Sequence, residues 1–177
     1  MNADDEGSAE LRSRISELVS AFEGYHMPLL HFMQSMNSLK EEFGGFPADD
    51  RLGTAVVISR DRHAEGRDLI AILLESEGFR IKLFDKNDSL EKVVEASGDT
   101  GVTAVCISVV TNYSCLEIYA LSRKLREAGI RDRIVFNAGG APVNEIIANE
   151  AGCDVFSKKA SETVSQIKQK VLEKAAI

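Results

Sequence analysis

Apolar residues recur at helical spacing near the start of the chain. Leu11, Ile15, Leu18 and Phe22 fall on one stripe of a helix. A second apolar stripe consists of Leu29, Met33, Met36, Leu39 and Phe43. It follows Pro28, a residue that suits the first position of a helix. The pattern therefore predicts a short helical hairpin. Because two amphipathic helices cannot cover all of their own apolar surface, we expect them to pack on the rest of the chain, a second copy or a partner protein.

The segment from Gly44 to Asp50 interrupts this periodicity and predicts a linker. It separates an N-terminal helical extension, 1–47, from a second domain, 52–177. In that domain short apolar runs at 54–58, 80–84, 102–107, 134–136 and 155–156 alternate with helical patterns. This order predicts an α/β fold with a five-stranded, parallel, doubly wound sheet, in which 80–84 forms an edge. Ser114, three residues before Glu117, is typical of a helix start.

Composition narrows the class of protein. The 177 residues carry a formal net charge of -7, and no basic patch is visible, so nucleic acid is not the expected partner. The three cysteines form no C-x-x-C pair and indicate reduced thiols. No apolar run approaches membrane-spanning length, and the N-terminus lacks the basic and apolar regions of a signal peptide. We expect a cytoplasmic protein that does not insert into a membrane.

The residues Asp61-Arg62-His63, with Gly66 three positions later, follow the first predicted strand directly. Open α/β sheets bind their ligands at this carboxyl edge. Residues two apart in a loop can project to the same side, so Asp61 can accept a hydrogen bond from one imidazole nitrogen of His63 and leave the other for a metal. Gly66 would let a bulky ligand approach the backbone. The alternative is a solvated surface loop without a ligand.

Two further strand ends fall at the same edge of the predicted sheet. One carries Ser108, Val110, Thr111 and Asn112, and the other carries the pair Gly139-Gly140. Two other classes with this fold lack their key residues here. A response-regulator receiver needs an acceptor aspartate where Ser108 stands, and a dinucleotide-binding fold needs a glycine-rich turn after the first strand, where only Gly66 occurs.

With these blocks in order, the chain resembles the cobalamin-binding domain family, whose pattern is D-x-H-x-x-G, then S-x-L, then G-G. The resemblance covers residues from about 52 to 174, and the block from Ala128 to Val143 looks most like the corrinoid proteins of methyltransferase systems. It implies a Rossmann-like or flavodoxin-like fold and cobalamin as the cofactor. Val110 replaces the usual leucine, and Asn112 stands where methyltransferase-type members tend to have threonine.

The resemblance also implies roles for individual residues. His63 would be the lower axial ligand of cobalt in place of the cofactor's own benzimidazole, Asp61 its hydrogen-bonded partner, and Gly66 a neighbour of the corrin. Ser108 would line a slot for the nucleotide tail, with Gly139 and Gly140 as its floor. The other implied cofactor-binding residues are Arg62, Val110, Thr111 and Asn112.

The implied function is that of a carrier. Such a protein shuttles a methyl group on cobalt between methyltransferase partners and does not complete a reaction alone. Its hairpin could complete a four-helix bundle in a homodimer. Two alternatives stay open: a cobalamin-sensing regulatory protein that acts through a partner protein, and the small cobalamin-binding subunit of a radical mutase.

Overall fold

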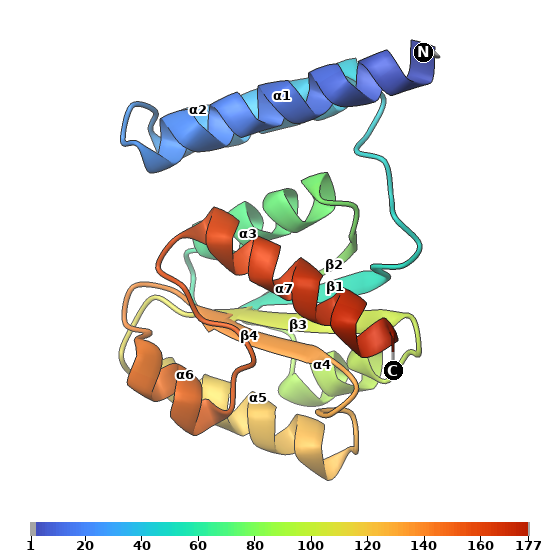
Figure 1. Ribbon diagram of the computed structural model, residues 1–177. Helices are drawn as coiled ribbons and strands as arrows, with labels where there is room; N and C mark the ends of the chain where they lie inside the picture. The colour runs from blue at the N-terminus through green and yellow to red at the C-terminus, as the bar shows by residue number, and fades with distance from the viewer. Residues whose placement is uncertain (1–2, 177) are drawn as a thin grey trace. The chain divides into compact units, whose positions relative to one another are not determined.

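The computed structural model describes residues 3–176 and divides into two compact units, Met1–Pro47 and Ala48–Ile177 (Figure 1). The first unit is the expected hairpin of α1 (Ala3–Glu23) and α2 (Leu29–Glu42). The rings of Phe22 and Phe32 stack with their centroids 4.7 Å apart. Arg14 donates to the carboxylate of Glu42 at 2.7 Å, so an apolar and an ionic contact both join the two helices.

The second unit alternates strands and helices. Its elements are β1 (Thr54–Ser59), α3 (Glu65–Ser76), β2 (Arg80–Phe84), α4 (Leu90–Ser97), β3 (Val102–Ser108), α5 (Cys115–Glu127), β4 (Val135–Gly139), α6 (Glu145–Ala151) and α7 (Ala160–Ala175). All strand pairs are parallel, in the order β2-β1-β3-β4. The strand β2 is an edge, as its alternating sequence predicted. Helices α3 and α7 cover one face of the sheet, and α4, α5 and α6 cover the other (Figure 1).

The prediction of a fifth strand is wrong. Val155 forms only an isolated bridge to Asn137. The backbone N–H of Phe136 donates to the carboxylate of Asp154 at 2.7 Å, and the Asn137 amide donates to the carbonyl of Val155 at 3.1 Å. The side chains of Asp154 and Asn137 thus form hydrogen bonds with backbone groups that a continuous strand pairing would use. The segment around Val155 therefore pairs with β4 at one residue only.

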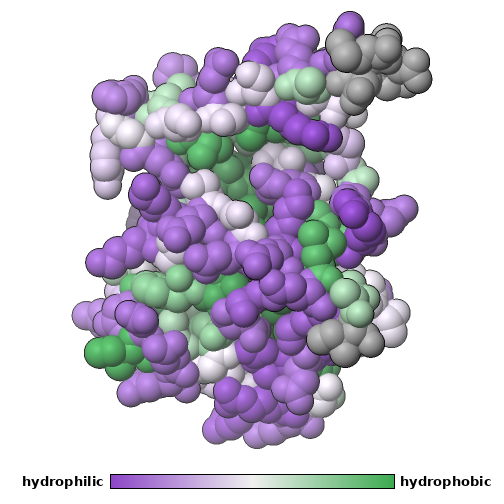
Figure 2. All heavy atoms as spheres, in the orientation of Figure 1, coloured by the Kyte–Doolittle hydropathy of each residue, from purple (hydrophilic) through white to green (hydrophobic). Residues whose placement is uncertain are grey.

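The helices turn their polar faces outward. On the face of the α/β unit in the lower part of Figure 2, hydrophilic residues are the majority and apolar residues form small separate patches. No helix between residues 3 and 176 is long and apolar enough to cross a membrane.

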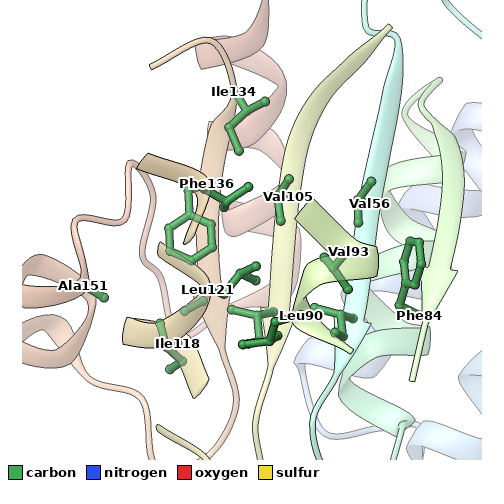
Figure 3. Close-up of a cluster of buried hydrophobic side chains, with 14 of the residues drawn as sticks. Val56, Phe84, Leu90, Val93, Val105, Ile118, Leu121, Ile134, Phe136 and Ala151 are labelled. Carbon is green, nitrogen blue, oxygen red and sulfur yellow. The ribbon is translucent and has the colours of Figure 1, made fainter. Parts of the chain in front are cut away.

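The main core lies between the sheet and the helices α4, α5 and α6. Figure 3 shows Val56 and Val105 on neighbouring strands, with Val93 of α4 and Leu121 of α5 in the same cluster. The strands β1 and β3 are buried along nearly their whole length, which explains their continuous apolar sequences. This core holds the strand ends in fixed register, so the loops that follow them start from fixed positions.

We predict that Leu121→Ala lowers the free energy of unfolding by about 2–5 kcal/mol, because a fully buried leucine leaves a cavity when truncated. The matched control is Leu116→Ala in the same helix, whose leucine is 62% exposed and whose loss should change stability by no more than about 0.5 kcal/mol. Urea unfolding followed by circular dichroism measures both. Equal effects in the two variants would contradict the assigned core.

Candidate functional site

The loop after β1 is anchored by a residue that the sequence patterns did not single out. Ser59 ends the strand and is fully buried. Its hydroxyl lies 3.3 Å from the carbonyl oxygen of Asp61 and 3.2 Å from that of His63 and can donate to either. The loop therefore turns back on its own strand, and the backbone on both sides of Arg62 is held in place.

Asp61 joins this loop to the loop after β3. Its carboxylate accepts a hydrogen bond from the backbone N–H of Val110 at 2.6 Å and from the hydroxyl of Ser114 at 2.7 Å. The hydroxyl of Thr111 lies 3.5 Å from the same carboxylate and 2.7 Å from the Ser114 hydroxyl. Ser114 does precede α5, as predicted, but its side chain makes no capping bond and serves Asp61 instead.

His63 lies beside this network with its side chain 74% exposed. The expected Asp61–His63 hydrogen bond does not form here, because the Asp61 oxygens face the β3 loop. Instead, His63 Nδ1 lies 3.4 Å from Glu65 Oε1. The pKa of Glu65 is lowered, first by its own backbone N–H and then by His63. With a carboxylate beside Nδ1, Nε2 is the nitrogen left to bind a metal.

A cavity of about 470 Å³ opens between the sheet and the helices α3 and α7. Strand register arranges its floor in two rows. The outer row contains the paired residues Ser108 and Gly139, and the inner row contains Val57, Cys106 and Asn137. The remaining walls come from the first half of α3, from the segment that leads into α7 and from the first turn of α7, including Gly66, Leu69, Ile70, Phe156, Lys158 and Thr163.

Three predicted glycines shape this cavity in different ways. A Cβ at Gly66 would lie 2.6 Å from the Ser108 hydroxyl, so the glycine lets α3 approach β3. A Cβ at Gly139 would meet nothing within 4 Å, and this glycine leaves the floor open. A Cβ at Gly140 would lie 1.7 Å from the carbonyl oxygen of Val109, and its φ of +120° is unfavourable for other residues. Gly140 lies in the cavity wall, and its backbone conformation and its closeness to Val109 both require a glycine there.

The chemistry of the site limits what could hold a metal. Burial raises the pKa of Cys106 to about 12, so its thiol stays protonated at neutral pH and is no thiolate ligand. Within the described residues, no group of three or more His, Cys, Asp or Glu side chains could hold an ion. His63 could therefore serve a metal only where another molecule supplies the remaining ligands.

The other predicted residues lie at the rim of the site. Val110 is 42% exposed, although its backbone binds Asp61. Arg62 and Asn112 are exposed, and neither side chain joins the Asp61 network. The patterns missed Asn137, which is buried in the cavity floor; its position two residues before Gly139 on a strand was the available signal, since alternate residues share a face.

A pre-shaped cavity opens between the sheet and the helices α3 and α7, and an exposed histidine stands in the loop after β1 at the same carboxyl edge, where α/β domains bind their cofactors. Residues 52–168 match the model of the B12 binding domain. The chain belongs to this family, which confirms the predicted family and its cofactor, cobalamin.

Individual relatives add detail. Trimethylamine corrinoid protein 1 of Methanosarcina acetivorans is 28% identical over 123 residues, which are 68% of this chain and 57% of that protein. The chain thus spans little more than half the length of the first relatives it matches.

Two solved structures share the fold. A cobalamin-binding protein from Desulfitobacterium hafniense DCB-2 superposes with a TM-score of 0.75 at 18% identity and covers 94% of this chain and 83% of its own. The methanol:cobalamin methyltransferase complex MtaBC from Methanosarcina barkeri gives 0.71 at 18% identity, over 89% of this chain and 63% of the other.

We predict unequal effects on stability for alanine substitutions at two neighbouring glycines. Gly140→Ala should lower the free energy of unfolding by at least about 2 kcal/mol, because of the left-handed φ and the contact with Val109. Gly139→Ala should unfold within about 0.5 kcal/mol of the wild type, since its methyl group enters open space. Thermal and urea unfolding measure both. A stable Gly140→Ala variant would contradict the assigned backbone constraint.

Proposed function

We propose that this chain is a corrinoid carrier that binds cobalamin and shuttles a methyl group between methyltransferase partners. The observation that carries the proposal is the cavity of about 470 Å³ that opens at the sheet edge where His63 stands. When bound, cobalamin supplies the cobalt atom that accepts and releases the methyl group. The names of the trimethylamine relative and of the methyltransferase complex support this class of function.

The residues present fit the nucleotide tail of the cofactor. Small-molecule sites typically measure about 300–1,000 Å³, so the cavity is large enough for a base and its ribose. Gly139 leaves the floor open, and Ser108 offers a hydroxyl in the outer row. With the tail in this cavity, His63 would hold the cobalt from below in place of the cofactor's own base, and Gly66 would lie beside the corrin.

The hydrogen bonds of the loops prepare His63 for this role. Ser59 fixes the backbone around His63, and Asp61 ties the same loop to Val110 and Ser114. A ligand residue on a pre-ordered loop loses less conformational entropy on binding than one on a free loop. The chain therefore contributes positioning, while methyltransferase proteins would bring the methyl donor and acceptor. We infer that these encounters take place in the cytoplasm, as composition predicts.

We predict that His63→Ala weakens cobalamin binding at least about tenfold, which corresponds to about 1.4 kcal/mol, because the cobalt loses its protein ligand. The matched control is His31→Ala, which removes a histidine of α2 in the N-terminal unit. Both variants and the wild type are incubated with hydroxocobalamin, desalted, reduced to cobalt(II) and measured by visible and EPR spectroscopy.

The wild type and His31→Ala should show the nitrogen splitting of a histidine ligand, and His63→Ala should lack it. An unchanged signal in His63→Ala would assign the cobalt ligand to another residue. A wild-type protein that retains no corrin would overturn the carrier function altogether.

The hairpin supports a second prediction, that two copies associate. The apolar stripes of α1 and α2 would complete a four-helix bundle in a homodimer. Size-exclusion chromatography with light scattering should then give about twice the chain mass of 19.3 kDa. A mass of one chain would refute the dimer and leave the carrier function intact, with the hairpin free for a partner protein.

A further inference from the structure

A second cavity, of about 460 Å³, lies at the amino edge of the sheet, away from the loop that carries His63. It is lined by Arg126, Arg131, Asp132, Gly152, Asp154 and Lys174. The ends of α5 and α7 meet there, because both helices run back from the carboxyl edge to the side where β4 begins (Figure 1). None of these residues lines the cavity between the sheet and the helices α3 and α7, so the two cavities are separate.

Arg131 is the buried cation of this second cavity. It is only 9% exposed, and its guanidinium lies 5.4 Å from the centre of the Phe136 ring. Its Nη2 lies 2.9 Å from the carboxylate of Asp154, which also accepts a hydrogen bond from the Phe136 backbone N–H at 2.7 Å. The Nε of Arg131 is buried and has no hydrogen-bond partner among the described residues. Since buried donors normally have a partner, this fixed cation keeps an unused donor.

Two further cations of the lining have neutral partners. Arg126 donates to the carbonyl of Ala151 at 3.2 Å, and Lys174 donates to the carbonyl of Asp132 at 2.7 Å. Neither forms an ion pair with another residue of the described chain. A guanidinium has five N–H donors and an ammonium has three, so both side chains keep donors for a ligand.

A glycine lets Arg126 lie in this position. The φ of Gly152 is +73°, and a Cβ there would lie 2.5 Å from Nη2 of Arg126. Any other residue at position 152 would push the guanidinium away from the backbone of Ala151. The backbone therefore places this cation in the cavity wall.

The charges of the lining indicate what the second cavity can hold. Asp154 is already paired with Arg131, so Arg126 and Lys174 stand with one unpaired carboxylate, that of Asp132. A doubly charged anion can accept hydrogen bonds from both cations, and the carboxylate can accept them from hydroxyl groups. The described lining has no apolar or aromatic side chain against which a nucleobase or an acyl chain could pack. The fitting ligand is small, polar and anionic, and it carries hydroxyl groups.

We propose that the second cavity binds a phosphate ester of a small polyhydroxylated compound, such as a sugar phosphate. Arg126 and Lys174 bind the phosphate, and Asp132 accepts hydrogen bonds from the hydroxyl groups. The volume of about 460 Å³ lies within the range of about 300–1,000 Å³ that is usual for small-molecule sites. The proposal does not depend on the carrier function, because the two cavities lie at opposite edges of the sheet.

Isothermal titration calorimetry of the full chain with glucose 6-phosphate tests the proposal. We expect a Kd of about 1 mM or lower, and binding at least about tenfold weaker for glucose and for inorganic phosphate, because each lacks part of the contacts. The double variant Arg126→Gln and Lys174→Gln should weaken glucose 6-phosphate at least about tenfold. The control is Arg123→Gln, which removes the charge of an exposed arginine of α5 that does not line the cavity, and it should bind as the wild type does.

Backbone amide NMR spectra of the wild type locate the ligand, even if the double variant does not fold. Glucose 6-phosphate should shift the amides of residues 130–133 and 151–154. Shifts at Ser108 and Gly139 instead would place the phosphate in the other cavity and overturn the proposal.

Three further results would overturn it. These are a wild type that does not bind glucose 6-phosphate, a folded double variant that binds it undiminished, and an equal affinity for inorganic phosphate. A hexaglutamate peptide serves as the last probe. If it bound more tightly than glucose 6-phosphate, the cations would be a contact for an acidic protein and not a small-molecule site. Cobalamin binding, measured on the same protein, tests the carrier function separately.

Discussion

The carboxylate of Asp61 is the contact on which the site depends. It accepts hydrogen bonds at 2.6 Å from the Val110 backbone and at 2.7 Å from the Ser114 hydroxyl, groups that lie 49 and 53 residues further along the chain. A carboxylate that accepts several short bonds makes a stronger junction than neutral groups would. The junction couples the loop that carries His63 to the loop that follows β3, and the parallel sheet sets the distance that it must bridge. A change in sheet register would therefore displace the histidine.

The same sheet builds the cavity with few special residues. Parallel strands in register place Ser108 beside Gly139 in one row and Cys106 beside Asn137 in the next. The missing side chain at Gly139 leaves space, and Gly66 lets a helix close over it. The core on the opposite face of the sheet keeps this arrangement rigid. One face of the sheet thus supplies stability, and the other can be left partly hollow for a ligand.

Much of this could be predicted from the sequence, because apolar runs and strand-end motifs are local signals. The strands β1 and β3 follow from continuous apolar runs, the hairpin follows from helical periodicity, and the residues at the carboxyl edge follow from their place after each strand. Long-range hydrogen bonds left no such signal. The partner of Asp61 is Ser114 and not His63, and the fifth strand is reduced to one bridge because Asp154 and Asn137 bind the backbone there. Spacing along the chain does not show which distant donor forms a hydrogen bond with a given carboxylate.

The decisive measurement is a crystal structure of the chain loaded with hydroxocobalamin. We expect the nucleotide tail to fill the cavity between the sheet and the helices α3 and α7, and His63 Nε2 to coordinate the cobalt. We also expect Asp61 to remain bonded to Val110 and Ser114. A cofactor whose own base stays on the cobalt, with an empty cavity and His63 still beside Glu65, would show that the chain does not hold the corrinoid in this way.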